Sequence, residues 1–396
     1  MQCGDREIDA AIEVVGKSQN ESLTHQLIDF LVGEKDGVPK DPNYIYRLYL
    51  ALKKYDEAAK TALIIARQEQ DLGNYALAHS VVVETIRQLE DAGMKVSLQL
   101  RQNFVLLHSY ILVKSLVRRG DHEGAARLLL RIAQSVSKFP LHMVQLLTST
   151  VIECQRAGLK ASAYEYAAIL MRPEYRPSIN PDLKRKIEAI VRRRVAQGEE
   201  APEATSACPV SAQLIPVTSL ECPTSREALP MCVITGRHMV LDDWCFCPVS
   251  KCPALYSEYV RYIEDELRSA AQTDTESKSA TSPQSSPASK NLNKSLSVPD
   301  PVLGKSVSIS DLSLATPEEA QKYIQKYNNV LDKKDEKKKD KAAAEGSVSP
   351  KGDASDENAG AEETEGGGTG TSSKKSSGQK ASKSKIERAR RNKKKH

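Results

Sequence analysis

The 396-residue sequence has few aromatic residues: they make up 5% of the chain, with one Trp and four Phe. Hydrophobic residues reach only 40%, somewhat below the share in a typical globular domain. The shortage is uneven, because residues 8–194 are rich in Leu, Ile, Val and Ala, whereas the stretch after residue 270 has almost no apolar clusters. We therefore expect the first part to bury a core and residues 268–396 to form a disordered, low-complexity tail.

Long apolar runs and a one-sided charge are also missing. No window approaches the roughly 18 apolar residues that a bilayer-spanning helix needs, and the first residues contain no apolar signal core. The 57 basic and 52 acidic residues leave a net charge of only +5, without the strong basic excess typical of nucleic-acid binders. We predict a protein that works in the cytoplasm or a compartment continuous with it, without a nucleic-acid partner.

Catalytic patterns are absent as well. The chain contains no Gly-x-Gly-x-x-Gly, no phosphate-binding loop and no Ser-centred elbow. His79, His108, His122 and His142 fall in helical stripes or at repeat turns, where a packed or solvated histidine is the common case. The adjacent carboxylates of the Asp242-Asp243 pair point apart, which favours a turn or a helix cap. We predict a protein that is not an enzyme and has no small-molecule substrate.

What the sequence does have, over residues 1–195, is helical periodicity. Apolar residues recur at intervals of three and four, as at Ile8, Ile12 and Val15. Asp41-Pro42 is a helix start, because Asp is a good N-cap and Pro fits the first turn. Sustained two-residue alternation bounded by hairpin turns is missing, so we predict that this region is entirely helical.

A turn phrase also repeats within these helices. Gly73, Gly120 and Gly158 are each followed five residues later by Ala, and Lys53 stands in the Gly place of a fourth copy. Gly accepts the left-handed geometry that ends a helix, and the small Ala lets the next helix approach closely. This phrase is typical of degenerate tetratricopeptide-like (TPR-like) repeats stacked into a solenoid. The alternative is an irregular helical bundle with ordinary turns.

After a linker at 196–206, residues 207–267 contain six of the eight Cys and the only Trp. A zinc knuckle needs two thiolates about three positions apart, usually as Cys-Pro-x-Cys. Here Cys208, Cys222 and Cys247 each begin a Cys-Pro-x-Ser phrase, and Ser is a poor zinc ligand. We predict a small, degenerate zinc-ribbon-like module after an otherwise all-α chain.

Two interpretations of this module remain open. In the first, the remaining thiols form one remodelled zinc site, for which the candidate ligands are Cys208, Cys222, Cys247 and Cys252. In the second, no cofactor is bound, and a metal-free remnant is held together by Trp244 and its apolar neighbours. Zinc is the one cofactor that the pattern allows.

Two features stand out in the expected tail. Thr316-Pro317-Glu318-Glu319 is a helix start, and the apolar residues that follow predict a short amphipathic helix near 316–332 that docks on a partner. Residues 383–395 form a basic run that either attracts acidic surfaces or solubilises the terminus.

Five phrases carry a family resemblance: LHSYILVK at 107–114, LTSTVIEC at 147–154, LMRPEYR at 170–176, TGRHM at 235–239 and PALYSE at 253–258. They resemble the C-terminal part of the WD-repeat subunits of intraflagellar transport complex A, over about residues 1–265. The resemblance implies a scaffold that contacts other complex A subunits and ciliary membrane cargo or adaptors. It also implies a function in retrograde transport and in the entry of cargo into the cilium. The implied location is the cilium or flagellum, the ciliary base and the cytoplasm.

The chain departs from this family in two ways. It begins inside the solenoid, which predicts a truncated or split gene product without propellers, and the family's last Cys-Pro-x-Cys has no match after Tyr262. Two rival functions are a vesicle-coat or tethering scaffold of the endomembrane system, and a ubiquitin ligase, which would need alternating Cys and His ligands. The scaffold mechanism that we predict uses the ridges and groove of residues 44–170.

Overall fold

The computed structural model of the chain describes residues 2–34, 37–193, 202–278 and 297–328. Predictions for residues 329–396, including the basic run at 383–395, lie outside the described residues.

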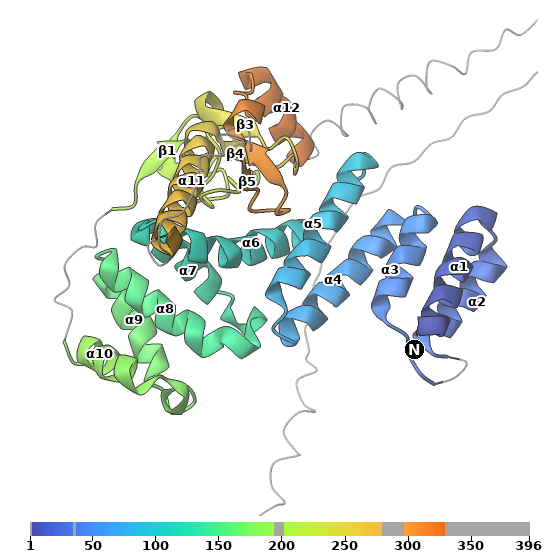
Figure 1. Cartoon of the computed structure of the whole chain (residues 1–396), viewed down its shortest axis with the longest axis horizontal. Coiled ribbons are helices and arrows are strands. Elements are labelled where there is room, and N and C mark those ends of the chain that lie inside the picture. Colours follow the sequence, from blue (N-terminus) through green and yellow to red (C-terminus); the bar gives the residue numbers. More distant parts are fainter. Residues whose placement is uncertain (1, 35–36, 194–201, 279–296, 329–396) are drawn as a thin grey trace, which may run out of the picture. The chain divides into compact units, whose positions relative to one another are not determined.

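A stack of helices forms the first part of the described chain (Figure 1). Each helix from α3 to α9 packs against the next one. The prediction of an all-helical region is confirmed, and none of the helices in the described ranges has the length and apolar character of a bilayer span. The helices are α1 (Gln2–Ser18), α2 (Glu21–Val32), α3 (Pro42–Ala51), α4 (Tyr55–Asp71), α5 (Tyr75–Asp91), α6 (Leu98–Arg118), α7 (His122–Ala133), α8 (Met143–Arg156), α9 (Lys160–Leu170) and α10 (Pro181–Arg192).

The repeated turn phrase has the geometry that the sequence predicts. Gly73, Gly120 and Gly158 have φ values of 82°, 78° and 79°, and Lys53 adopts the same left-handed conformation at 57°. Five residues after each of these positions the Ala side chain is buried against neighbouring helices, at Ala58, Ala78, Ala125 and Ala163. The left-handed residue ends one helix and the small side chain admits the next, so the solenoid-type stacking follows from this local pattern.

The cysteine-rich part is built from short antiparallel pairs rather than helices. Strand β1 (Thr205–Ala207) pairs with β2 (Leu214–Pro216), and β3 (Trp244–Phe246) pairs with β4 (Pro253–Leu255). Helix α11 (Tyr256–Lys278) follows β4 directly. Trp244 is fully buried in the core between these elements. Within the expected linker, Glu203 accepts hydrogen bonds from the backbone and hydroxyl of Thr218, so the end of this segment belongs to the folded part.

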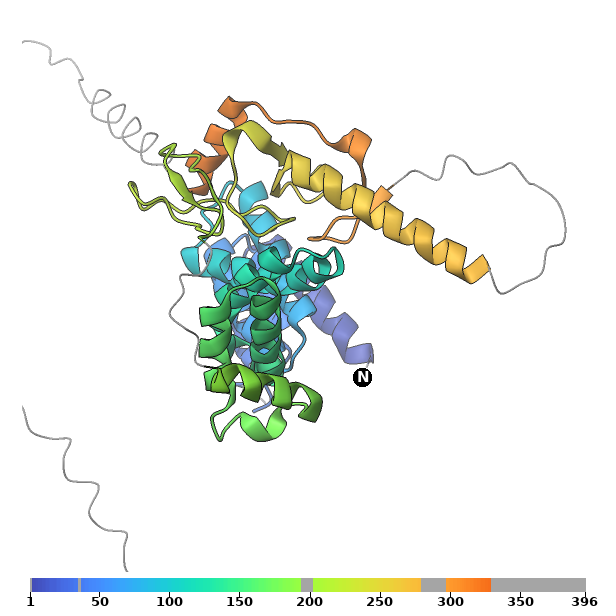
Figure 2. The ribbon, with the colours of Figure 1, turned by 90° about the vertical axis from the view of Figure 1, so that its left-hand side faces the viewer.

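The expectation of disorder from residue 268 onward is wrong for two described segments. Helix α11 continues to Lys278, and residues 297–328 fold into β5 (Ser297–Pro299), β6 (Ser306–Ser308) and α12 (Pro317–Tyr327). Both views show β5 beside α11 (Figure 2). The average composition hides a few apolar side chains that are all buried in the module core, namely Val298, Val302, Val307, Leu312, Ala320 and Ile324.

Helix α12 begins where the sequence predicts, but its apolar face is already occupied. Thr316 and Glu319 form a reciprocal capping box at its start. Ala320 and Ile324 are buried in the module core, and the Tyr323 ring lies 6.0 Å from that of Trp244. The predicted docking on a partner groove is therefore corrected, because this face packs against its own chain.

The end of α12 is fastened to a distant part of the module. Asn328 accepts a hydrogen bond from the backbone N–H of Ala228 at 3.0 Å and donates one to its carbonyl at 3.0 Å. The guanidinium of Arg101 on α6 stacks on the Tyr327 ring, 3.8 Å from its centroid, and also donates to the Tyr327 carbonyl. Helix α12 therefore ties the helical stack to the cysteine-rich part.

Candidate interaction site between the helical stack and the cysteine turns

Four six-residue turns in the module share one backbone geometry, and each begins with Cys. In every one the first N–H donates to the sixth carbonyl, and the fifth N–H donates to the first carbonyl. The fifth residue is left-handed in each turn, with φ between 58° at Ala212 and 74° at Gly236. We call these the cysteine turns, and they span residues 208–213, 222–227, 232–237 and 247–252.

Three of the cysteine turns begin with the Cys-Pro-x-Ser phrase that the sequence shows, whereas the one at 232–237 lacks this phrase and was not predicted. This turn has Val233 where the others have Pro, and Thr235 where the others have Ser. The signal that could have found it is the Cys-x-x-Thr-Gly spacing, because Gly236 suits the left-handed fifth position. Three backbone carbonyls of this missed turn, at Val233, Ile234 and Gly236, accept hydrogen bonds from side chains of the helical stack.

The structure separates the four candidate zinc ligands. Cys208 and Cys222 lie together in one small apolar cluster with Ile215 and Leu229. Cys247 lies in the larger module core, and Cys252 packs against that core as the last residue of the same turn. The candidate set is therefore two pairs in two places.

The residues at these turns do not fit a structural zinc ion. A closed tetrahedral site takes four ligands, usually thiolates or imidazoles. In the described residues no group of three or more Cys, His, Asp or Glu side chains is arranged to hold an ion. The fourth position of each turn, where a zinc knuckle has its second thiolate, carries a hydroxyl at Ser211, Ser225, Thr235 and Ser250.

The thiols themselves have different electrostatic surroundings. Burial raises the pKa of Cys245 to about 12 and also raises the pKa of Cys232. Cys232 instead accepts hydrogen bonds from the backbone N–H groups of Ile234 and Leu255, at 3.4 and 3.3 Å. At Cys222, burial opposes ionisation, yet hydrogen bonds from Ser225 lower its pKa to about 6. Burial therefore keeps the Cys232 and Cys245 thiols protonated at physiological pH.

A chain of buried histidines connects the stack to the cysteine turn at 232–237. His79 Nε2 on α5 lies 3.0 Å from His108 Nδ1 on α6, and His108 Nε2 lies 2.9 Å from the carbonyl oxygen of Val233. A carbonyl only accepts, so His108 Nε2 carries a proton; neutral His108 then accepts at Nδ1 from His79. Burial, followed by the neighbouring His108, lowers the pKa of His79 to about 3, and burial lowers the pKa of His108.

Arg131 on α7 is the second connection. Its guanidinium donates to the carbonyls of Thr218, at 2.8 Å, and Gly236, at 3.0 Å, and to Ser109 Oγ at 3.2 Å. Burial lowers its pKa to about 10, so it stays charged at physiological pH. The planar fork of donors suits this role because it reaches carbonyls on two separate loops.

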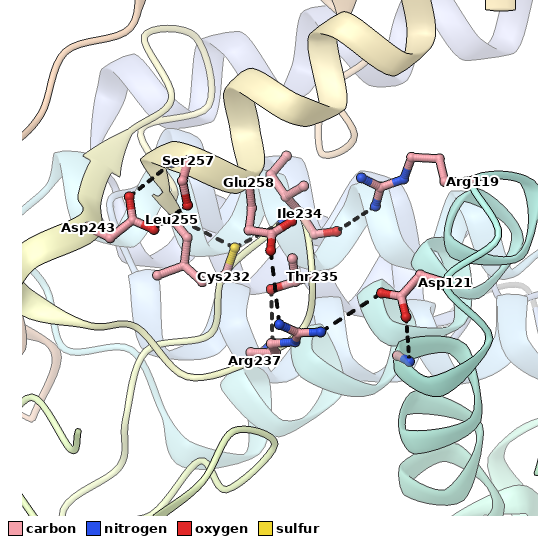
Figure 3. A network of polar contacts seen from close by, with 11 residues as sticks. Arg119, Asp121, Cys232, Ile234, Thr235, Arg237, Asp243, Leu255, Ser257 and Glu258 are labelled. Atoms are coloured by element: carbon pink, nitrogen blue, oxygen red, sulfur yellow. Dashed lines mark hydrogen bonds and ion pairs between the residues drawn. The ribbon is translucent and has the colours of Figure 1, made fainter. Parts of the chain in front are cut away.

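Further polar contacts involve α7, the cysteine turn at 232–237 and α11 (Figure 3). Arg237 lies between Asp121, which caps α7, and Glu258 on α11, with N–O distances of 3.9 and 4.0 Å. Asp243 accepts from the backbone and hydroxyl of Ser257 in the first turn of α11, which confirms the predicted capping role for this one of the two acidic residues. The part of the predicted binding surface around α5 to α7 is thus covered by the module of the same chain.

A groove remains open where α6 and the end of α7 meet the turn at 222–227 and the end of α12. Its volume is about 700 Å³. Leu98 contributes an apolar side chain that is 63% exposed, and Lys138 and Arg226 are exposed cations at its border. Four cationic side chains line the groove, Arg101, Arg131, Lys138 and Arg226, against the single carboxylate of Glu221. Its chemistry suits a segment that combines acidic and apolar side chains.

The chain is similar to known proteins over about two thirds of its length, although no family model matches it. It is 52% identical to WD repeat-containing protein 19 of Mus musculus over 259 residues, which are 65% of this chain and 19% of the mouse protein. The human protein of the same name is 53% identical over 251 residues. The WD repeat-containing protein dyf-2 of Caenorhabditis elegans is 40% identical over 249 residues, 18% of its length.

These similarities confirm the resemblance that the five sequence phrases indicate. The chain spans about a fifth of the length of these relatives, since the shares are 19%, 19% and 18%. About two thirds of the chain is similar, in sequence, to part of a WD repeat-containing protein.

Proposed function

We propose that the chain is a non-enzymatic scaffold of intraflagellar transport complex A, acting in retrograde ciliary transport and in the entry of membrane cargo. Its partners are other complex A subunits and cargo adaptors, and it works at the ciliary base, in the cilium and in the cytoplasm. The observation that carries this proposal is the 52–53% identity to WD repeat-containing protein 19 over about two thirds of the chain.

The architecture supports a binding role. Stacked helices offer extended surfaces whose contacts depend on side-chain complementarity rather than on a catalytic centre. The buried His79 and His108 are used for packing, and Asp243 caps a helix. These polar groups therefore contribute to the fold.

The groove beside Leu98 is the docking position that we propose for a neighbouring subunit. The module leaves this position open, and it combines an exposed apolar side chain with cationic neighbours. The proposed occupant is a segment with acidic and apolar residues. Such a segment would bury Leu98 at its centre and place carboxylates next to Lys138 and Arg226.

Affinity purification of the full chain from ciliated cells tests both levels of the proposal. We expect complex A subunits, including propeller-bearing chains, to co-purify. Leu98→Asp combined with Lys138→Glu should reduce their recovery, whereas the fold should remain because Asp is favourable at the first position of α6.

Leu141→Asp is the matched control, since Leu141 is also 63% exposed, lies just before a helix and does not line the groove. Equal recovery of complex A subunits with the two variants would exclude the groove as the docking position, but it would not exclude membership of the complex.

A vesicle-coat or tethering scaffold of the endomembrane system is the alternative function. Such proteins also use helical solenoids, so the fold alone does not separate the two functions. Recovery of coat or tethering factors, together with localisation to Golgi or endosomal membranes instead of cilia, would favour the alternative.

A further inference from the structure

A fifth turn in the described chain repeats the backbone of the cysteine turns, and it begins with Asp300. The N–H of Asp300 donates to the carbonyl of Lys305, and the N–H of Gly304 donates to the carbonyl of Asp300, both at 2.8 Å. The fifth residue, Gly304, is left-handed with φ 69°, and Pro301 occupies the second position. Strands β5 and β6 flank this turn as β3 and β4 flank the turn at 247–252.

The Asp300 carboxylate makes the local contacts that a thiolate makes in a zinc knuckle. One oxygen, Oδ2, accepts from the backbone N–H groups of Val302 and Leu303 at 3.1 and 2.9 Å. In the turn at 247–252, Cys247 Sγ likewise accepts from the backbone N–H of Ser250 at 3.4 Å. The side chain of the first residue thus holds each turn closed.

The other carboxylate oxygen joins the two turns. Asp300 Oδ1 accepts from Cys247 Sγ at 3.3 Å and from the hydroxyl of Tyr259 at 2.9 Å. Tyr259 comes from α11, is completely buried, and also lies 3.3 Å from Cys247 Sγ. Three elements that are far apart in the sequence therefore meet at one carboxylate.

Asp300 itself is only 2% exposed, so its oxygens depend on contacts within the protein rather than on water. A buried carboxylate is costly unless its lone pairs are satisfied. Asp300 accepts four hydrogen bonds, two on each oxygen, so that its buried oxygens are satisfied without a cation. Among the ion pairs of the described residues, none involves Asp300.

We infer that residues 300–305 are a fifth, altered zinc knuckle and that the Asp300–Tyr259–Cys247 hydrogen bonds take the place of a zinc ion between this turn and the turn at 247–252. The fourth positions of the two turns are Ser250 and Leu303, neither of which supplies a good zinc ligand. The module core is therefore closed without metal, and residues 297–308 are part of its structure.

Metal content and thermal unfolding of the purified full chain test this inference directly. Trp244, the only Trp, is fully buried in the module and reports its unfolding by fluorescence. We expect no stoichiometric zinc and the same melting temperature with and without a strong chelator. Stoichiometric zinc whose removal lowers the melting temperature would overturn the inference.

Substitution of the carboxylate provides a second test. Asp300→Ala should lower the melting temperature by roughly 5–10 °C, because it leaves the Tyr259 hydroxyl and two backbone donors without their acceptor. Asp242→Asn is the matched control, since Asp242 is exposed in the same module, and should leave the melting temperature unchanged. A melting temperature that is the same in both variants would contradict the inference, and an Asp300→Ala chain that does not fold would support it if Asp242→Asn folds.

Restoring the ligands gives a third test. The combination Ser250→Cys, Asp300→Cys and Leu303→Cys would place two Cys-x-x-Cys turns opposite each other, with Cys247 as the fourth ligand. We expect this variant to bind one zinc ion per chain and to become sensitive to chelation. Absence of zinc binding in a folded variant would show that the two turns do not face each other as knuckles.

Discussion

His79 Nε2 lies 3.0 Å from His108 Nδ1, and both imidazoles are buried where the helical stack meets the module. Both are held neutral, so their burial makes the fold sensitive to acid. An exposed histidine does not cause this sensitivity, because its protonated form remains in contact with water and does not destabilise the folded state.

The histidine pair predicts a loss of stability on acidification. The folded-state pKa of His79 is about 3 against a usual value of 6.5, so the unfolded chain binds more protons between these values. The contribution is fully present above about pH 6.5, and it should fall by about 1.4 kcal/mol per pH unit as the pH decreases below that value. Urea unfolding between pH 7.5 and 5 measures this dependence.

His79→Leu should weaken this pH dependence, even though it lowers stability at pH 7.5. His25→Leu, at an exposed position on α2, should retain it. If the free energy of unfolding has the same pH slope in both variants, the buried pair is not the cause.

Arg131 predicts a large stability cost for a single substitution. Arg131→Met keeps much of the apolar stem but leaves the carbonyls of Thr218 and Gly236 without their charged donor. We expect the free energy of unfolding of the module to fall by about 3 kcal/mol, measured by the fluorescence of Trp244. Arg185→Met, at an exposed position on α10, should change it by less than about 0.5 kcal/mol.

Lys53 offers a stabilising substitution. It occupies the Gly place of the turn phrase with φ 57°, a conformation that costs an ordinary side chain about 1–2 kcal/mol. Lys53→Gly should therefore raise the free energy of unfolding by roughly 0.5–1 kcal/mol, since part of the gain is offset by the greater freedom of Gly in the unfolded chain. Lys54→Gly, whose φ is −86°, should not stabilise. Stabilisation by both variants would mean that the backbone geometry is not the reason.

Gly236 and Gly304 occupy the fifth position of their turns, and comparing Ala substitutions at the two sites distinguishes the cost of backbone strain from the cost of a steric clash. Gly236 and Gly304 are both left-handed, with φ 74° and 69°. A Cβ at Gly236 would lie 2.6 Å from Leu128 Cδ2 on α7, whereas one at Gly304 would meet nothing within 4 Å. Gly304→Ala should cost about 1 kcal/mol from backbone strain alone, and Gly236→Ala clearly more. Equal costs, measured by denaturant unfolding, would show that the turn at 232–237 is not packed tightly on α7.

The helical part was predictable because its signals are local. Apolar spacing gives the helices, and the step from Gly73 to Ala78 or from Gly120 to Ala125 gives their turns within six residues. The histidine chain was not predictable, because a packed His and a connecting His look alike in a sequence. Only the approach of Val233 to His108 across 125 residues distinguishes them.

The fifth turn was hidden for a different reason. Asp300 replaces the Cys by which a knuckle is identified, and the surrounding Ser-rich composition is typical of a disordered tail. The remaining signal is Pro301 followed by Gly304 between two short segments that each contain one Val, and it is weak without the pattern of the other four turns. Only the hydrogen bonds across to Cys247 and Tyr259 reveal what the carboxylate does.

The pairing of Asn328 with Ala228 has a practical consequence for choosing where to cut this protein. A shortened version that stops near residue 268, where apolar clusters become sparse, would lose Tyr323 and leave one side of Trp244 bare. Such a truncated chain would expose apolar surface and aggregate. Its failure to remain soluble could then be mistaken for the effect of a missing metal or partner. Expression boundaries should therefore be placed beyond residue 328.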